Sequence, residues 1–342
     1  MTNLKHPEGN FLQSDEWGKC AEKVGHKAIR KTFKNGESVL MLVKDARRGR
    51  YLEIPGGPLI DWSDEADVKA VFDEIKEVAK AEKCVFVRFR PQLYKTDENV
   101  ALVKKTGSKD APFHLHAQNT VILDLTKTED ELLANMRRQT RYEVRRSAKL
   151  ELIVKKGTSD ELFKEFHTVQ VETAKRQNFI PPNMDELEAY HEIFKDHATI
   201  YYVETSKNLT IDGKKIIEGE PEGEFIPAGT IINYGLFIDY GEEVEYFEAA
   251  STEYGHAVPG AYGMLWQVAQ DYKKKGIKRF NLWGIAPPNQ PHHRYAKVTT
   301  FKTGFGGEQV EFIHAQDIVI DKVKYLITKA VEEIRKKKRH LS

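Results

Sequence analysis

The first 120 residues alternate between strand-like and helix-like patterns of apolar side chains. Residues 38–43 and 51–54 are short apolar runs, and Pro55-Gly-Gly-Pro58 ends the second one with a predicted tight turn. Apolar residues then recur at helical spacing over about 64–82, and residues 84–89 form a nearly continuous apolar run. These patterns predict two strands, a helix and a third strand that is covered on both faces.

A second unit begins near residue 120. Residues 120–124 predict a strand, and Thr128-Glu-Asp-Glu131 has the spacing of a capping box that opens a helix. Arg138, Arg141 and Arg145 are three and four residues apart on that helix, so they share one face. We therefore expect one cationic surface here.

The rest of the chain continues the same mixture of elements. Helical spacing predicts helices over about 160–176, 185–196, 260–275 and 317–338. Apolar runs predict strands over about 199–204, 228–238, 243–250 and 278–283, and the polar stretch 205–227 predicts an inserted hairpin or loop. Both halves thus favour a mixed α/β unit, and two such units packed side by side are the simplest architecture.

Composition narrows the class of protein. A chain of 342 residues exceeds the usual size of one hydrophobic core, so two domains are expected. The chain has no apolar stretch long enough to span a membrane and no apolar signal segment after Met1, which favours the cytoplasm. Cys20 and Cys84 are then reduced thiols. His292 and His293 are adjacent, which is a poor spacing for one metal ion, so we expect no metal.

Charge is unevenly distributed although the net charge is only +1. Residues 136–149 and the segment from Ile334 to the C-terminus are strongly basic. Two interpretations stay open: solvated helical faces, or a surface for a polyanion, because clustered Lys and Arg release counterions when they bind phosphates. The basic C-terminal helix either packs on its own domain or contacts an anionic bilayer surface.

Three motifs are candidates for chemistry. Residues 11–19, Phe-Leu-Gln-Ser-Asp-Glu-Trp-Gly-Lys, open a helix with Ser14 as the N-cap. Residues 281–288, Asn-Leu-Trp-Gly-Ile-Ala-Pro-Pro, end a buried strand, where α/β sheets bind ligands. In Phe301-Lys-Thr-Gly-Phe305 an aromatic–lysine pair beside glycines suits a nucleotide or phosphate, or else only the entry to a hairpin.

Taken in order, these motifs resemble those of the Fem-type (FemABX) peptidoglycan bridge-forming aminoacyltransferases. The resemblance implies an α/β fold of two tandem GCN5-related acetyltransferase-like domains, with mixed sheets and flanking helices. It implies a first domain of residues 1–122 joined by a returning segment, 306–342, and a second domain of residues 123–305. Some relatives carry a coiled-coil arm, but Pro181-Pro182 interrupts the corresponding helices, so we expect no arm.

The resemblance also implies an activity. Such enzymes take glycine, alanine or serine from aminoacyl-tRNA and attach it to a side-chain amine of a UDP-linked or lipid-linked peptidoglycan precursor. The ester is already activated, so we expect no cofactor, and we expect a monomer. Phe301 and Lys302 match the pair that meets the 3′ end of the tRNA, with Lys302 as the catalytic candidate. Arg138, Arg141 and Arg145 are then candidates for the acceptor stem.

Precursor binding is implied for a second set of residues. Lys19, with Trp17 nearby, matches a lysine that lies near the precursor's phosphates. This chain departs from its relatives at three places: Arg90 replaces an aspartate, Glu248 stands where a tyrosine is common, and an arginine near residue 180 is missing. Arg176 and Tyr254 are the nearest substitutes for the missing arginine and tyrosine.

Three alternatives remain for the function. A CoA-dependent N-acyltransferase would have the same fold, although the glycine-rich loop that holds the CoA pyrophosphate is not visible in the sequence. A non-catalytic nucleic-acid-binding protein would explain the arginines but not the Trp-Gly and Phe-Lys motifs. A related aminoacyltransferase acting on a different amine, of a protein or a lipid, fits the departures.

Overall fold

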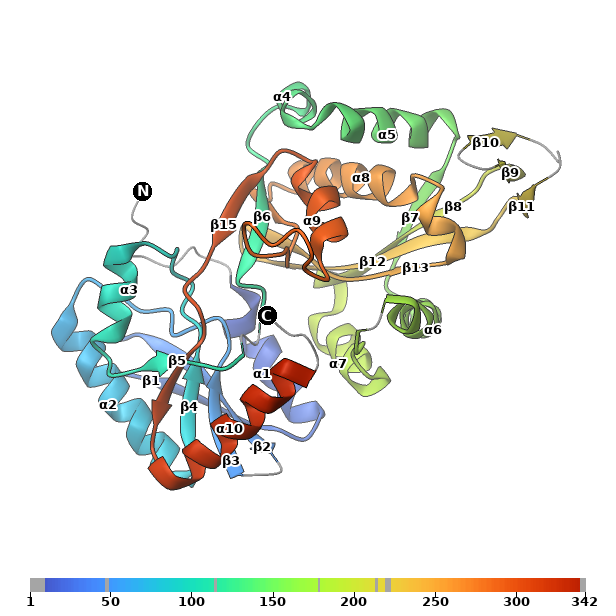
Figure 1. Ribbon diagram of the computed structural model, residues 1–342. Coiled ribbons are helices and arrows are strands. Elements are labelled where there is room, and N and C mark those ends of the chain that lie inside the picture. The colour runs from blue at the N-terminus through green and yellow to red at the C-terminus, as the bar shows by residue number, and fades with distance from the viewer. Residues whose placement is uncertain are drawn as a thin grey trace. The chain divides into compact units, whose positions relative to one another are not determined.

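The computed structural model describes residues 10–46, 49–113, 116–177, 179–212, 215–218 and 223–338. The chain divides into two compact units, and each is formed by segments that are distant in sequence (Figure 1). Unit 1 comprises Met1–Thr120, Gly284–Ala296 and Val310–Ser342. Unit 2 comprises Val121–Trp283 and Lys297–Gln309.

Unit 1 contains a six-stranded mixed sheet with the order β1-β2-β3-β4-β16-β5. Its strands are β1 (Lys27–Thr32), β2 (Ser38–Ala46), β3 (Gly49–Ile54), β4 (Phe86–Phe89), β5 (Lys109–Asp110) and β16 (Gln316–Val319). The first three strands are antiparallel, and β3 and β4 are parallel because α2 (Glu65–Ala81) connects them. Strand β16 then pairs antiparallel with both β4 and β5.

Unit 2 contains a seven-stranded sheet with the order β15-β6-β14-β13-β12-β8-β7. Its strands are β6 (Asn119–Asp124), β7 (Ile153–Gly157), β8 (Ala198–Glu204), β12 (Ile231–Tyr240), β13 (Glu243–Ser251), β14 (Arg279–Asn281) and β15 (Glu308–Glu311). Strands β8, β12 and β13 are antiparallel, β13 and β14 are parallel across α8 (Gly260–Lys274), and β6 pairs antiparallel with β14. Both units therefore repeat one topology, and the expected α/β fold with two mixed sheets is confirmed.

Helices flank both sheets, and two of them, at Asp97–Lys104 and Ala296–Thr303, were not predicted from the sequence. The apolar stripe of α2 is buried in the core of unit 1 beside Trp62 and Phe89. Unit 1 also has α1 (Asp15–Lys23), α3 (Asp97–Lys104) and α10 (Lys322–Lys338), and unit 2 has α4 (Glu129–Asn135), α5 (Arg138–Lys149), α6 (Asp160–Gln177), α7 (Met184–Phe194) and α9 (Ala296–Thr303). The predicted caps are confirmed: Ser14 accepts from the backbone N–H of Trp17, and Thr128 and Glu131 form a capping box.

Two predicted elements were wrong. The single helix after Thr128 is two helices, because Met136 and Arg137 have extended backbones between α4 and α5. Residues 316–319 are strand β16, and α10 begins only after Asp321, whose carboxylate accepts from two backbone N–H groups of its first turn. The hairpin predicted in the polar insertion is confirmed: β9 (Leu209–Asp212) pairs antiparallel with β10 (Lys215–Glu218), and β11 (Glu224–Ile226) adds a third strand beside β9.

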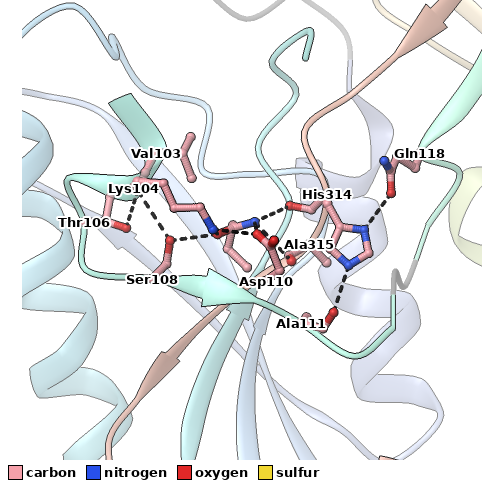
Figure 2. A network of polar contacts seen from close by, with 10 residues as sticks. Val103, Lys104, Thr106, Ser108, Asp110, Ala111, Gln118, His314 and Ala315 are labelled. Carbon is pink, nitrogen blue, oxygen red and sulfur yellow. Dashed lines mark hydrogen bonds and ion pairs between the residues drawn. The ribbon is translucent and has the colours of Figure 1, made fainter. Parts of the chain in front are cut away.

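A polar network attaches the C-terminal strand to unit 1 (Figure 2). The side chain of Gln316 is buried and bridges three residues: Asp110 (2.8 Å), Lys104 (3.1 Å) and Ser108 (3.1 Å). Next to it, the ring of His314 lies between the side-chain oxygen of Gln118 (2.7 Å) and the carbonyl of Ala111 (2.8 Å). These contacts fix β16 beside the short strand β5, although about 200 residues separate them.

Candidate functional site

A buried lysine and a partly buried glutamate in unit 2 interact electrostatically. Lys302 is on α9 with 8% of its surface exposed, and its Nζ lies 5.5 Å from the ring centre of Tyr246 on β13. Burial lowers the pKa of Lys302 to about 7, and the charge of Glu248 opposes this shift. Burial also raises the pKa of Glu248 to about 7, against the hydrogen bond from Gln170 and the charge of Lys302. Two groups that ordinarily carry full charges therefore both titrate near neutral pH.

Helix α6 holds Glu248 in place. The Gln170 side chain is fully buried, and its Nε2 donates to Oε2 of Glu248 at 2.7 Å. Two more residues on this face of α6 bind the end of β13: Thr173 Oγ1 donates to the carbonyl of Ser251 at 2.9 Å, and Arg176 donates to the same carbonyl. Arg176, the expected substitute for a precursor-binding arginine, therefore lies on the helix face that holds Glu248.

Aromatic rings surround the next residue of β13. Phe247 packs edge-on against Tyr190 of α7 at 5.5 Å and against Trp283 at 5.7 Å. Trp283 follows β14 and has a φ of +61°, which is unusual for a bulky residue. The side-chain oxygen of Asn281 accepts a hydrogen bond from the backbone N–H of Trp283 at 3.0 Å, which stabilises this turn. The predicted ligand-binding strand end thus contributes an aromatic wall next to β13.

The loop after Lys302 packs against the start of the arginine-rich helix. The backbone N–H of Arg137 donates to the carbonyl of Gly304 at 2.8 Å, and its guanidinium donates to Thr303 at 3.0 Å. A Cβ on Gly304 would lie 2.2 Å from Oγ1 of Thr140, so only glycine allows this approach. Phe301 packs edge-on against Tyr262 at 4.9 Å. The Phe-Lys motif is thus at the end of a helix, not the entry to a hairpin, and it adjoins α5.

The three arginines of α5 differ in their surroundings. Arg138 and Arg145 are exposed. Arg141 is half-buried and donates to the carbonyls of Ala134 at 2.9 Å and Met136, which are at the end of α4. Its guanidinium therefore caps α4, as cations do at helix C-termini. Arg138 and Arg145 are the two that present their charge to solvent.

The remaining predicted residues lie elsewhere. Trp17 and Lys19 are on α1 in unit 1, where Trp17 packs edge-on against Phe11 at 5.4 Å and Lys19 is exposed. Tyr254 belongs to unit 2 but packs into a separate apolar cluster with Ile232 and Val258. Arg90, which replaces an aspartate of some relatives, is buried in unit 1 with its guanidinium over the ring of Phe312.

Sequence reasoning missed Gln170. It is a polar residue in the apolar stripe of α6, four residues after Phe166 and seven after Phe163, and all three are buried. A buried polar side chain needs a hydrogen-bond partner, so this break in the stripe was a readable signal of a polar site. The sequence did not reveal that its partner would be Glu248.

Metal and disulfide chemistry finds no support in the described residues. Within the ranges that the structure describes, no three His, Cys, Asp or Glu side chains are grouped to hold a metal ion. Cys20 and Cys84 are both buried thiols outside any disulfide. In the same ranges, every helix is too short or too polar to cross a bilayer.

Comparison with known proteins adds to this geometry. The family model of the FemAB family matches residues 3–208 and 214–333. The lipid II:glycine glycyltransferase of Staphylococcus aureus is 27% identical over 198 residues, which are 54% of this chain and 47% of that protein. The chain thus spans about half the length of the curated relatives it matches.

Two solved structures are similar in fold. The crystal structure of FemX matches with a TM-score of 0.79 and 17% identity, over 95% of this chain and 96% of that one. The structure of L-PGS from Bacillus licheniformis matches with a TM-score of 0.52 and 14% identity, over 89% of each chain. At these identities the similarity concerns the fold alone.

Proposed function

The chain belongs to the FemAB family, and from that premise we propose that it is an aminoacyltransferase that builds peptidoglycan precursors. It takes an amino acid, of which glycine, alanine and serine are the candidates, from an aminoacyl-tRNA. It transfers that residue to the side-chain amine of a stem peptide on a UDP-linked or lipid-linked precursor. The name of the related glycyltransferase supports this substrate class. The observation that carries the proposal is the pair formed by Lys302 and Glu248.

The reaction needs a neutral amine and a stabilised oxyanion. The acceptor amine attacks the ester carbonyl, a C–N bond forms, and the C–O bond to the terminal ribose breaks. Glu248, with a pKa of about 7, accepts the proton that the amine loses and returns it to the departing ribose oxygen. Lys302 in its protonated form stabilises the negative charge on the ester oxygen, and a buried cation is effective there because little water screens it.

The surroundings of the pair support a tRNA donor. Arg138 and Arg145 present their charge on the helix whose first turn packs against the loop after Lys302. A tRNA acceptor stem bound to these arginines would bring its 3′ end toward Phe301 and Lys302. Exposed arginines bind phosphates without reading sequence, as expected for an enzyme that recognises the end of a tRNA.

The experiment that tests the proposal is a transfer assay. The protein is incubated with glycyl-, alanyl- or seryl-tRNA and UDP-linked pentapeptide, and mass spectrometry measures the gain of one residue. Lys302→Met should reduce the rate about 100-fold or more, the usual effect of removing an oxyanion donor. Lys297→Met is the matched control, because Lys297 is on the same helix but exposed, and its rate should stay within about twofold of the native rate. Transfer from acetyl-CoA and not from charged tRNA would contradict the proposal.

A further inference from the structure

Helix α10 presents an apolar stripe to solvent. Half of the large apolar side chains that are exposed in the described part of the chain lie on this helix. They are Val323 (71% exposed), Leu326 (65%), Ile327 (56%) and Ile334 (53%). Their spacings of three, four and seven residues put them on one side of the helix. Such a contiguous stripe differs from single exposed apolar residues, which are common on protein surfaces.

The opposite side of α10 is fixed to unit 1. Tyr325 is buried, its hydroxyl donates to Asp317 at 3.0 Å, and its ring packs edge-on against Phe86. Further along α10, Glu332 forms an ion pair with Arg88 at 2.9 Å. Because these contacts determine which side faces inward, the apolar stripe is held facing outward.

Cations flank the stripe. Residues 322–339 contain eight Lys and Arg but only two Glu, and one of these, Glu332, forms an ion pair with Arg88 on the inner side of the helix. Lys322 and Lys324 are exposed in the first turn, on either side of Val323. The amino-acid sequence at the C-terminal side of the stripe is also basic, Arg335-Lys-Lys-Lys-Arg339. An apolar face between basic flanks is the pattern of a helix that lies in the headgroup region of a membrane.

We propose that the outer face of α10 docks on the surface of an anionic lipid bilayer. The apolar stripe enters the boundary between headgroups and acyl chains, and the lysines bind lipid phosphates. A second copy of the chain is a poorer occupant, because two such helices packed face to face would bring their basic flanks together. The surface does not depend on the proposed transfer reaction, but it would bring unit 1 to a membrane in which a lipid-linked acceptor lies.

Cosedimentation with lipid vesicles tests this surface. The protein should bind vesicles of phosphatidylcholine with phosphatidylglycerol, and binding should weaken steeply with salt and with removal of the anionic lipid. Leu326→Ser with Ile327→Ser should weaken binding about tenfold or more, since each residue loses apolar burial. Ile180→Ser is the matched control, because Ile180 is 79% exposed but isolated, and its binding should be unchanged. Lys322→Gln and Lys324→Gln should each cost about fivefold.

Four results would overturn the proposal. These are no binding to anionic vesicles, equal binding to neutral ones, an equal effect of Ile180→Ser and the double variant, or a dimer without lipid that the double variant abolishes. The substituted side chains are exposed, so the melting temperature of each variant should match that of the native protein. The double variant should also keep the native rate of transfer to a soluble UDP-linked precursor. If vesicles bind but no variant or native protein transfers an amino acid, the proposed function fails while the docking surface stands.

Discussion

Arg88 and Asp317 form a bidentate ion pair between residues that are 229 positions apart in the chain. Nε of Arg88 lies 2.7 Å from Oδ1 and Nη2 lies 2.8 Å from Oδ2, with both side chains buried. Asp317→Ala leaves this guanidinium with only the partly buried Glu332, so we expect a loss of about 3–5 kcal/mol in the free energy of unfolding, measured by urea denaturation. Glu311→Gln, which removes an exposed pair with Lys95, should cost about 1 kcal/mol or less. Equal effects of the two substitutions would contradict a stabilising role for the buried pair of Arg88 and Asp317.

The pH dependence of transfer should be bell-shaped with a maximum near neutral pH. Below pH 7 Glu248 becomes protonated and cannot accept a proton, and above pH 7 Lys302 loses the charge that stabilises the oxyanion. Measuring kcat/KM from pH 5 to 9 checks this. Glu248→Gln should lower kcat about 100-fold or more and remove the acidic limb of the profile. An unchanged acidic limb in this variant would exclude Glu248 as the base.

The stability difference between Lys302→Met and the native protein should shrink as pH rises. The pKa of Lys302 falls from 10.5 in the unfolded chain to about 7 in the folded one, so between these values the unfolded state binds more protons. Native stability therefore rises with pH across this window, by up to about 1.4 kcal/mol per pH unit, and the variant lacks this gain. Unfolding at pH 6.5, 8 and 9.5 measures the difference. A difference that stays constant across the three pH values would mean that folding does not lower the pKa of Lys302.

The arginines of α5 should separate into two classes. Arg138→Gln and Arg145→Gln should weaken tRNA binding, and each should reduce the slope of log affinity against log salt by about 1. Arg141→Gln should instead lower the melting temperature, because Arg141 caps α4, and should leave the salt slope unchanged. Filter binding at several salt concentrations and thermal unfolding make the comparison. A uniform effect of all three on the salt slope would show that Arg141 also contacts phosphates.

Close packing of α8 on α5 should make Gly263 sensitive to substitution. A Cβ on Gly263 would lie 2.1 Å from Oγ and 2.9 Å from Cβ of Ser147, so Gly263→Ala should destabilise unit 2 by about 1–3 kcal/mol. Combining it with Ser147→Gly should recover part of this loss, and Ser147→Gly alone measures the cost of glycine in the helix. A double-mutant cycle in urea tests the coupling. Additive effects would mean that the cost of Gly263→Ala does not arise from its contact with Ser147.

Local signals in the sequence predicted the elements whose causes are local. The capping box at Thr128 and the stripe of α2 depend on residues three or four positions apart, so the sequence displays them directly. Strand β16 depends on the distant edge of β4, and its apolar residues also fit helical spacing, which is why a helix was predicted there. The return of residues 284–296 to unit 1 has no local signature either.

The site was predictable to a similar extent. Lys302 and Glu248 were singled out through the resemblance, and their roles stay predictions. Their pKa shifts arise from burial within unit 2, which no spacing in the sequence encodes. The capping role of Arg141 was also hidden, because it requires the break between α4 and α5 that the periodicity did not reveal.

The position of β16 has a consequence for how the chain is made. During synthesis, β4 leaves the ribosome more than 200 residues before the strand that pairs with its outer edge. Until then the edge of β4 lacks its partner strand and Arg88 lacks Asp317. We therefore expect nascent unit 1 to remain incompletely folded while unit 2 is synthesised. A nascent chain stalled before Gln316 should therefore be digested by protease in its N-terminal part, even though all of that part has already been translated.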